Sequence, residues 1–331
     1  MAVRTPVRPR ISRGRTPGII RGRTLRATDA RWGLAMSMPT LLILLVIVVI
    51  PVAWTVLLAF QRVTLLNIRS AGIQGPYSLA NVEQVIRDPG FVSGVLVTLA
   101  YSVFGTAGSI VIGLAAALAL RKRFRGRFLV RGVMLLPYVT PVVAAAYVWQ
   151  VMLNPTLGLV NQVGVNWLGW KHAVPFLSEQ TGHLPLTGNS VSVPTALIMV
   201  ILFDTWRYFP FAFLFFSARM QALAPELEEA AMVDGASTVA RFRYIIYPQL
   251  RNVILLLVLL RFIWTFNKFD DVYLLTGGGA GTQVVSIRVY QFLTAYSNVG
   301  ASSAEALLLA VLLGVFAVLF SLFQRRTQAG P

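Results

Sequence analysis

Six long apolar runs constrain this 331-residue sequence more than any other feature. A helix needs roughly 20 mostly apolar residues to cross the hydrocarbon core of a bilayer. Because lipid offers no partners to backbone amides and carbonyls, each run must pair its own backbone groups, as a helix does. The sequence therefore predicts an all-α, polytopic membrane helix bundle with about six transmembrane helices, placed at 34–60, 92–120, 132–153, 194–217, 252–276 and 304–323.

Composition supports the bilayer as the main solvent and narrows the chemistry. Only 12% of the residues are charged, 56% are hydrophobic, and the mean hydropathy is +0.70. The chain has no cysteine, which excludes disulfides and thiolate metal sites. Its two histidines, His172 and His183, argue against a histidine-based catalytic or metal centre. We therefore expect a non-catalytic chain that binds no metal and no cofactor.

The net charge of +17 is distributed in a way that indicates membrane topology rather than nucleic-acid binding. Nine arginines lie in residues 1–33, and six basic residues without an acid lie in residues 121–131. Further arginines lie in 218–251 and at 325–326. Loops that are rich in lysine and arginine stay in the cytoplasm. The pattern predicts a multi-pass protein of the bacterial plasma membrane with both termini in the cytoplasm.

Residues 1–30 form a basic cytoplasmic tail in front of a transmembrane domain at 31–331. The tail is rich in Arg, Pro, Gly and Thr, a composition that cannot bury a core and predicts no stable fold. It could attach to anionic membrane lipid, but a tail that only sets the topology is the favoured reading.

Between the fourth and fifth spans, residues 218–250 form a connector that is too polar to enter lipid. Pro225 suits the first position of a helix, and the acids that follow suit its positive end. Asp234-Gly235 is typical of a helix C-cap, and Ser237 or Thr238 can cap a second helix. The sequence of the connector therefore predicts a helix–turn–helix on the arginine-rich side of the membrane.

This connector resembles the signature loop of ATP-binding-cassette (ABC) importer permeases. The match begins with Glu-Ala-Ala at Glu229, and three residues separate it from Gly235. Nine residues then lead to Ile245, and one more to Tyr247-Pro248, where the family usually has Leu-Pro. The resemblance implies a type I importer permease fold with a coupling helix that docks into a cleft of an ATPase subunit. The expected coupling residues are Glu229, Ala230, Ala231, Asp234, Gly235 and Ala236.

Four further segments resemble the carbohydrate-type branch of these permeases, which includes the maltose transporter subunits: 81–82 with 88–91, 135–138 with Trp149, 154–161 and 269–279. The resemblance implies a second permease subunit of a different but related sequence, two ATPase subunits that use ATP and Mg²⁺, and an extracytoplasmic solute-binding protein. It favours a sugar or sugar-derived solute and leaves a glycerophosphodiester or other small polar solute open. A stand-alone secondary transporter is the alternative, but its two halves should show a repeat that is not evident here.

Polar residues inside the predicted spans are candidates for the solute path, because such residues are costly in lipid. They are Asp204, Trp206, Arg207, Arg261, Trp264, Asn267 and Asp270. The alternative is ion pairing between helices, or pairing between Asp204 and Arg207 on one helix face. Asp270, Asp271 and Glu305 lie near span ends, where we expect them to meet water. The glycine run at 276–282 lacks the Lys-Ser/Thr ending of a phosphate-binding loop, so ATP hydrolysis is expected elsewhere.

Overall fold

The computed structural model describes residues 24–122, 124–183 and 192–328. The chain divides into two compact units, Met1–Trp54 and Thr55–Pro331. In the first, α1 (Thr24–Leu44) runs through a π-helical turn, η1 (Leu45–Val49), into α2 (Ile50–Ala59). Ala35–Ala59 is long and apolar enough to cross a membrane, which matches the span predicted at 34–60. Because α1 begins at Thr24, the expectation of an unfolded tail is wrong for residues 24–30; residues 1–23 lie outside the described residues.

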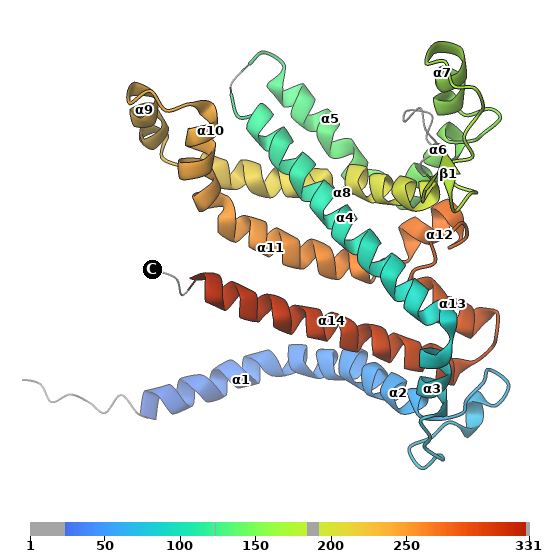
Figure 1. The fold of residues 1–331 in the computed structure, drawn as a ribbon. Coiled ribbons are helices and arrows are strands. Elements are labelled where there is room, and N and C mark those ends of the chain that lie inside the picture. Colours follow the sequence, from blue (N-terminus) through green and yellow to red (C-terminus); the bar gives the residue numbers. More distant parts are fainter. Residues whose placement is uncertain (1–23, 123, 184–191, 329–331) are drawn as a thin grey trace, which may run out of the picture. The chain divides into compact units, whose positions relative to one another are not determined.

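Four long helices form the frame of the second unit: α4 (Pro89–Ala119), α8 (Thr195–Gln221), α11 (Tyr247–Phe266) and α14 (Val299–Gln328). α4 packs along α8 and α11, and α14 along α11 (Figure 1). Glycine allows the closest of these approaches. A Cβ on Gly113 would lie 2.6 Å from the Cβ of Ala212 and 2.8 Å from the carbonyl oxygen of Phe209. Small residues at such a position let two helix backbones approach in lipid, where no hydrophobic effect drives helices together.

The predicted span 132–153 is not one straight helix. It consists of α5 (Arg127–Val139) and α6 (Val142–Met152), which meet at 96°. Pro141 explains the break, because it has no amide hydrogen and holds Thr140 in an extended conformation, with ψ 133°. Within the described residues, five helices are long and apolar enough to cross a membrane, or six if this bent pair counts as one span.

The predicted span 252–276 also needs correction at both ends. Its helix begins at Thr238, since α10 (Thr238–Arg241) and a π-helical turn, η4 (Phe242–Ile246), run without interruption into α11. It ends at Phe266, where Asn267, Lys268, Asp270 and Asp271 interrupt the apolar run. A separate short helix follows, α12 (Asp270–Thr276), and Gly277 closes it with φ +63°.

Short elements complete the second unit. The helical ones are η2 (Ile68–Ser70), α3 (Ala80–Arg87), α7 (Leu159–Trp167), α9 (Pro225–Val233) and α13 (Val285–Thr294). Two-residue strands, β1 (Gly182–His183) and β2 (Ser192–Val193), pair antiparallel within the long loop after α6. The fold is therefore the predicted helix bundle with one small β-ladder that the sequence did not indicate.

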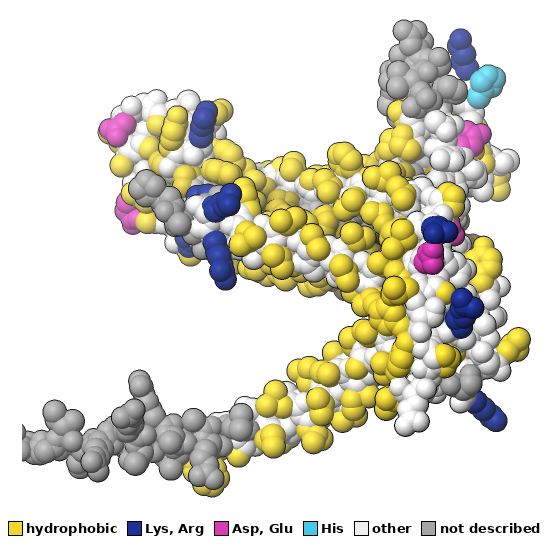
Figure 2. All heavy atoms as spheres, turned by 60° about the horizontal axis from the view of Figure 1, so that its bottom comes forward, with side chains coloured by type: hydrophobic (Ala, Val, Ile, Leu, Met, Phe, Trp, Pro, Cys, Tyr) yellow, Lys and Arg dark blue, Asp and Glu magenta, His cyan; other side chains and the backbone are white. Residues whose placement is uncertain are grey.

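The surface of the second unit matches a chain that lies in a bilayer. On the face that Figure 2 shows, hydrophobic side chains cover the flanks of the long helices, whereas Lys, Arg, Asp and Glu gather at the two ends. The α9–α10 connector lies at one end and α3, α12 and α13 lie at the other (Figure 1). The apolar flanks are the surface that lipid or a partner's helices would cover.

The close approach at Gly113 predicts a sharp effect of a single methyl group. Gly113→Ala must push two helix backbones apart, and overpacking of this kind costs about 1–3 kcal/mol. Gly314→Ala on α14 is the matched control, because no atom lies within 4 Å of its new Cβ. We expect a lower melting temperature of the detergent-purified chain for Gly113→Ala only; equal melting temperatures for both variants would contradict the packing described.

Candidate functional site

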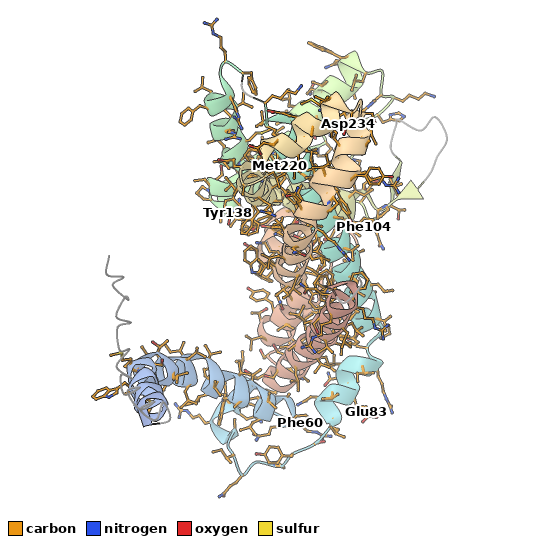
Figure 3. All side chains as sticks on the ribbon, turned by 90° about the vertical axis from the view of Figure 1, so that its left-hand side faces the viewer. Phe60, Glu83, Phe104, Tyr138, Met220 and Asp234 are labelled. Atoms are coloured by element: carbon orange, nitrogen blue, oxygen red, sulfur yellow. The ribbon has the colours of Figure 1, made fainter. Side chains whose placement is uncertain are left out.

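The candidate coupling site is the α9–α10 connector at one end of the bundle. Figure 3 views the bundle from this end and labels Met220 near the end of α8 and Asp234 in the turn after α9. α9 begins with Pro225 at its first turn, followed by Glu226 and Glu228, as the sequence predicts. This places acidic side chains at the positive end of the helix dipole.

Gly235 closes α9 with two capping hydrogen bonds. Its amide donates to the carbonyl of Met232 at 3.1 Å, and the amide of Ala236 donates to the carbonyl of Ala231 at 2.8 Å. These are the two bonds of a Schellman motif, which needs a left-handed residue at this position. Gly235 has φ +77°, so the predicted Asp-Gly cap is confirmed.

Ser237 starts the second helix of the connector. Its hydroxyl oxygen accepts a hydrogen bond from the amide of Ala240 at 3.2 Å, which confirms Ser237 as the N-cap. Since α10, η4 and α11 are continuous, the helix that begins beside the turn is the same helix that enters the membrane. A displacement of the turn therefore acts directly on a transmembrane helix.

The exposed face of the connector is apolar at its centre and acidic at its edges. Met232 and Val233 are 52% and 87% exposed, and Ala230 is exposed beside Glu229 and Asp234. Exposed apolar clusters of this kind mark protein contact surfaces. The predicted coupling residues thus lie together on one short helix and its cap.

Glu228 differs from its neighbours because it points back to the bundle. Its carboxylate forms an ion pair with Arg121 just after α4. The side chains of Arg121 and Glu228 are only 27% and 18% exposed. This contact ties α9 to the end of α4, and the sequence analysis did not identify it.

Inside the bundle, Asp204 of α8 and Arg261 of α11 form a fully buried ion pair. The Nη2 of Arg261 lies 2.7 Å from Oδ2 of Asp204, and the two side chains are 1% and 0% exposed. The Nε of Arg261 donates to Ser109 of α4 at 3.3 Å, and its guanidinium lies 4.2 Å from the ring centroid of Tyr208. Three helices thus meet at one buried arginine.

Arg207 lies near this pair but has another partner. Its Nη1 donates to the carbonyl of Thr140 at 2.9 Å, at the bend between α5 and α6. The proposed pairing of Asp204 with Arg207 along one helix face is therefore replaced by Asp204 with Arg261. Arg207 supplies a donor to a carbonyl at the break in the helix, where a backbone acceptor lacks its helical partner.

A second polar cluster lies at the break between α11 and α12, around Lys268. Its ammonium donates to the Tyr208 hydroxyl and lies 3.3 Å from Asp270 and 3.8 Å from Asp271. Asp270 is 45% exposed, whereas Asp271 is buried, so the expectation that Asp271 meets water is wrong. Burial raises the pKa of Asp271 to about 7, and the nearby Lys268 charge opposes this rise.

The structure divides the seven candidate path residues into two groups. Asp204, Arg207 and Arg261 are buried, and Trp206 is half-buried against Trp149, with ring centroids 5.7 Å apart. The other three have exposed surface: Trp264, Asn267 and Asp270.

Two exposed tyrosines that the sequence did not indicate form an aromatic cluster with Phe269. Tyr273 of α12 and Tyr290 of α13 are 40% and 39% exposed, and their ring centroids are 5.4 Å apart. Phe269 stacks on Tyr273 at 4.8 Å. Tyr290 lies outside every predicted span, so intramembrane polarity could not single it out.

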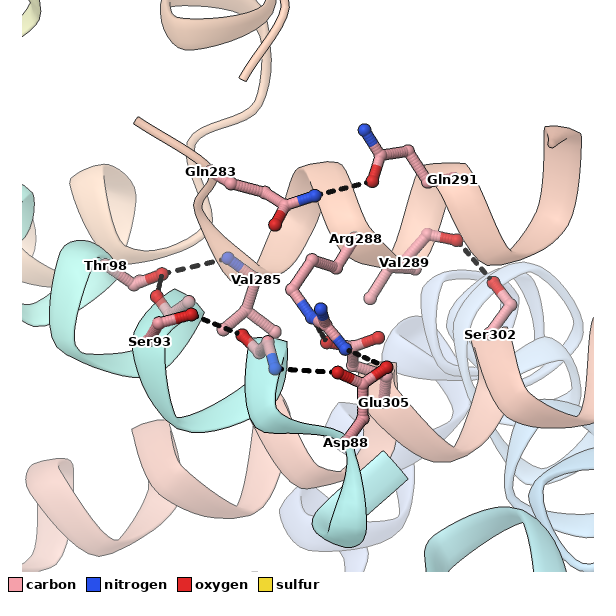
Figure 4. Close-up of polar contacts among 12 residues, drawn as sticks. Asp88, Ser93, Thr98, Gln283, Val285, Arg288, Val289, Gln291, Ser302 and Glu305 are labelled. Atoms are coloured by element: carbon pink, nitrogen blue, oxygen red, sulfur yellow. Dashed lines mark hydrogen bonds and ion pairs between the residues drawn. The ribbon is translucent and has the colours of Figure 1, made fainter. Parts of the chain in front are cut away.

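At the opposite end from the connector, Arg288 of α13 joins α4 to α14 (Figure 4). Its Nε lies 2.6 Å from Glu305 and its Nη2 lies 3.4 Å from Asp88. Glu305 is 0% exposed, so the expectation that it meets water at a span end is wrong. A buried carboxylate needs a charged partner, and Arg288 supplies it.

The model of the family described as binding-protein-dependent transport system inner membrane component matches residues 109–329. The inner membrane ABC transporter permease protein YcjO of Escherichia coli is 33% identical over 293 residues, which cover 88% of this chain and 93% of that protein. The trehalose/maltose transport system permease protein MalF of Thermococcus litoralis is 30% identical over 308 residues, covering 89% and 94%. A bacterial ABC transporter involved in import of the acidic polysaccharide alginate has a chain with TM-score 0.73 at 21% identity, covering 92% and 99%.

The buried pair predicts strong and non-additive effects of mutation. Arg261→Met or Asp204→Leu alone leaves one uncompensated buried charge and should destabilise the chain by about 3–5 kcal/mol. The double variant removes both charges, so its cost should fall well below the sum of the two single costs. Melting temperatures of the detergent-purified chain measure this cycle, with the exposed Arg243→Met as the control. Additive costs would show that the two charges do not interact.

Proposed function

As a member of the family of binding-protein-dependent transport system inner membrane components, this multi-pass chain is a permease subunit of an ABC importer, and we propose that it forms half of the translocation path for a sugar. The family model and the relatives cover most of the chain.

The α9–α10 connector carries the proposed contact with an ATPase subunit. The single most telling observation is the Schellman-capped turn at Gly235, beside the exposed side chains of Met232 and Val233. The cap gives the short helix a fixed end, and the apolar side chains give it a surface that a cleft can cover. Glu229 adds a carboxylate for a basic residue of the partner.

The two helices that flank the connector transmit the movement. α8 leads into α9, α10 leads into α11, and the Asp204–Arg261 pair holds α8 and α11 together inside the bundle. A shift imposed on α9 would therefore move both helices as a unit. In the proposed cycle, this movement exposes the path to one side of the membrane and then to the other.

The exposed polar and aromatic side chains support a carbohydrate as the solute. Trp264, Tyr273 and Tyr290 offer aromatic faces to a sugar ring, while Asn267 and Asp270 offer partners to hydroxyl groups. Of the two arginines among the candidate path residues, Arg261 is paired with Asp204, and Arg207 donates to the carbonyl of Thr140. Both side chains are buried, so neither guanidinium offers an exposed charge to a phosphate, which favours a neutral sugar over a glycerophosphodiester. The name of the trehalose/maltose relative points the same way.

The proposed assembly contains this chain, a second permease of related but different sequence, two ATPase subunits and an extracytoplasmic binding protein. The ATPase subunits would use ATP and Mg²⁺, and this chain would bind no cofactor. Basic residues lie at the connector end of the bundle, among them Arg219, Arg241, Arg325 and Arg326. By the positive-inside rule this end, with the C-terminus, faces the cytoplasm.

Gly235→Arg tests the coupling contact. We expect loss of the co-purified ATPase and of solute uptake, because the change strains a left-handed residue and adds bulk to the docking surface. Gly169→Arg is the matched control, since Gly169 has φ +72° and, like Gly235, no neighbour within 4 Å of a new Cβ. Retained ATPase and uptake in the Gly235 variant would refute the coupling role.

Trp264→Ala tests the solute path separately. We expect the KM for sugar uptake to rise by roughly tenfold, as loss of one aromatic contact of about 1–1.5 kcal/mol implies, while the ATPase still co-purifies. Trp167→Ala is the control, because Trp167, the last residue of α7, is 84% exposed. Uptake should be measured across neutral sugars and glycerophosphodiesters. Unchanged sugar uptake by Trp264→Ala, or uptake of glycerophosphodiesters alone, would contradict the assignment.

A further inference from the structure

A groove of about 470 Å³ lies between the end of α4 and the α10–η4 segment, and the coupling contact described above does not use it. Its apolar floor consists of Leu118, Val239, Phe242 and Ile246. Three basic residues line it as well: Arg121, Lys122 and Arg241. The groove therefore combines an apolar surface with a cluster of positive charge.

The positive charge in this groove is only partly neutralised. Glu228 is the one acidic residue that lines it, and this carboxylate is paired with Arg121. Lys122 and Arg241 remain as the excess cations. The Nη2 of Arg241 donates to Thr238 at 3.2 Å, while its Nε is buried without a hydrogen-bond partner among the described residues. The rest of the Arg241 guanidinium and the Lys122 ammonium supply the donors that line the groove.

The groove lies where the membrane interface is expected. Leu118 belongs to the apolar span Pro89–Ala119, whereas Arg121 and Lys122 follow that span directly. On the other wall, Thr238 and Arg241 lie at the beginning of the span Thr238–Phe266, and Ile246 lies farther along it. Charged groups thus lie at the level of lipid head groups, with Val239 and Phe242 beside them, and Leu118 and Ile246 lie deeper.

We propose that this groove binds an anionic phospholipid, with the phosphodiester between Lys122 and Arg241 and the first acyl carbons on the apolar floor. A soluble phosphate would use the cations but leave Val239 and Phe242 uncovered. A zwitterionic lipid would cover the floor, but its own cation would oppose the two basic side chains. Only a lipid of net negative charge satisfies both parts of the groove.

Such a lipid bridges α4 to α10 directly beside the Arg121–Glu228 pair that ties down α9. Binding therefore favours the position of the coupling helix seen in this structure. The inference does not depend on the solute or on the ATPase, because it concerns the lipid affinity of this chain alone.

Native mass spectrometry of the full-length chain, released from detergent micelles, tests the proposal. The probes are phosphatidylglycerol and phosphatidylcholine with identical acyl chains, and glycerol 3-phosphate as a head group without chains. The test variant is Lys122→Gln with Arg241→Gln, and the matched control is Arg243→Gln with Arg219→Gln. These control arginines lie near the same end of the bundle, in α8 and η4, but do not line the groove. Val239→Glu is a second test variant, since Val239 is 74% exposed and tolerates a polar group.

We expect wild type and the control to retain phosphatidylglycerol in preference to phosphatidylcholine. Basic residues near a membrane surface attract anionic lipid, so the double test variant should lose at least roughly tenfold in affinity. Val239→Glu should also weaken binding. Equal retention of the two lipids, equal loss in test and control variants, or binding of glycerol 3-phosphate as strong as that of the lipid would overturn the proposal.

Discussion

The buried ion pair between Asp204 and Arg261 is the interaction on which the arrangement of the second unit depends. Neither side chain reaches water, so each charge is tolerable only because the other is 2.7 Å away. The pair joins α8 to α11, and Ser109 brings in α4 through the same guanidinium. The ring of Tyr208 covers the guanidinium and links it to Lys268. In an apolar bundle, where hydrophobic contacts discriminate poorly between helix orientations, such a network selects one packing.

This network also joins the helices on either side of the proposed coupling connector. The connector leaves the bundle from α8 and returns through α10 into α11, the same two helices that the ion pair joins. The ion pair between Arg121 and Glu228 also fixes α9 to the end of α4. A partner that moves α9 therefore acts on three helices that are already connected by charges. Coupling over this distance needs no flexible linker, because rigid helices carry the displacement.

Local chemistry made the connector predictable from sequence. A proline at the first turn, an Asp-Gly cap and a serine N-cap depend on neighbours within a few residues, and all three were found at the expected positions. The number and approximate placement of the apolar spans were predictable for the same reason, since hydropathy is a local property. The bend at Thr140–Pro141 was missed, although the proline signals it.

The pairing of charges could not be predicted, because it depends on which helices are neighbours. Asp204 has Arg207 three residues away but pairs with Arg261, and Glu305 lies at a span end but is buried against Arg288. Sequence spacing describes one helix at a time, whereas these contacts lie between helices.

The α9 surface is proposed to contact an ATPase subunit. The chain contains no cysteine, so a single introduced cysteine reports one position. In the assembled transporter, Val233→Cys should cross-link to the ATPase through a short bifunctional reagent, while Leu66→Cys, 97% exposed in the loop after α2, should not. A cross-link from Leu66→Cys, or none from Val233→Cys, would contradict the account.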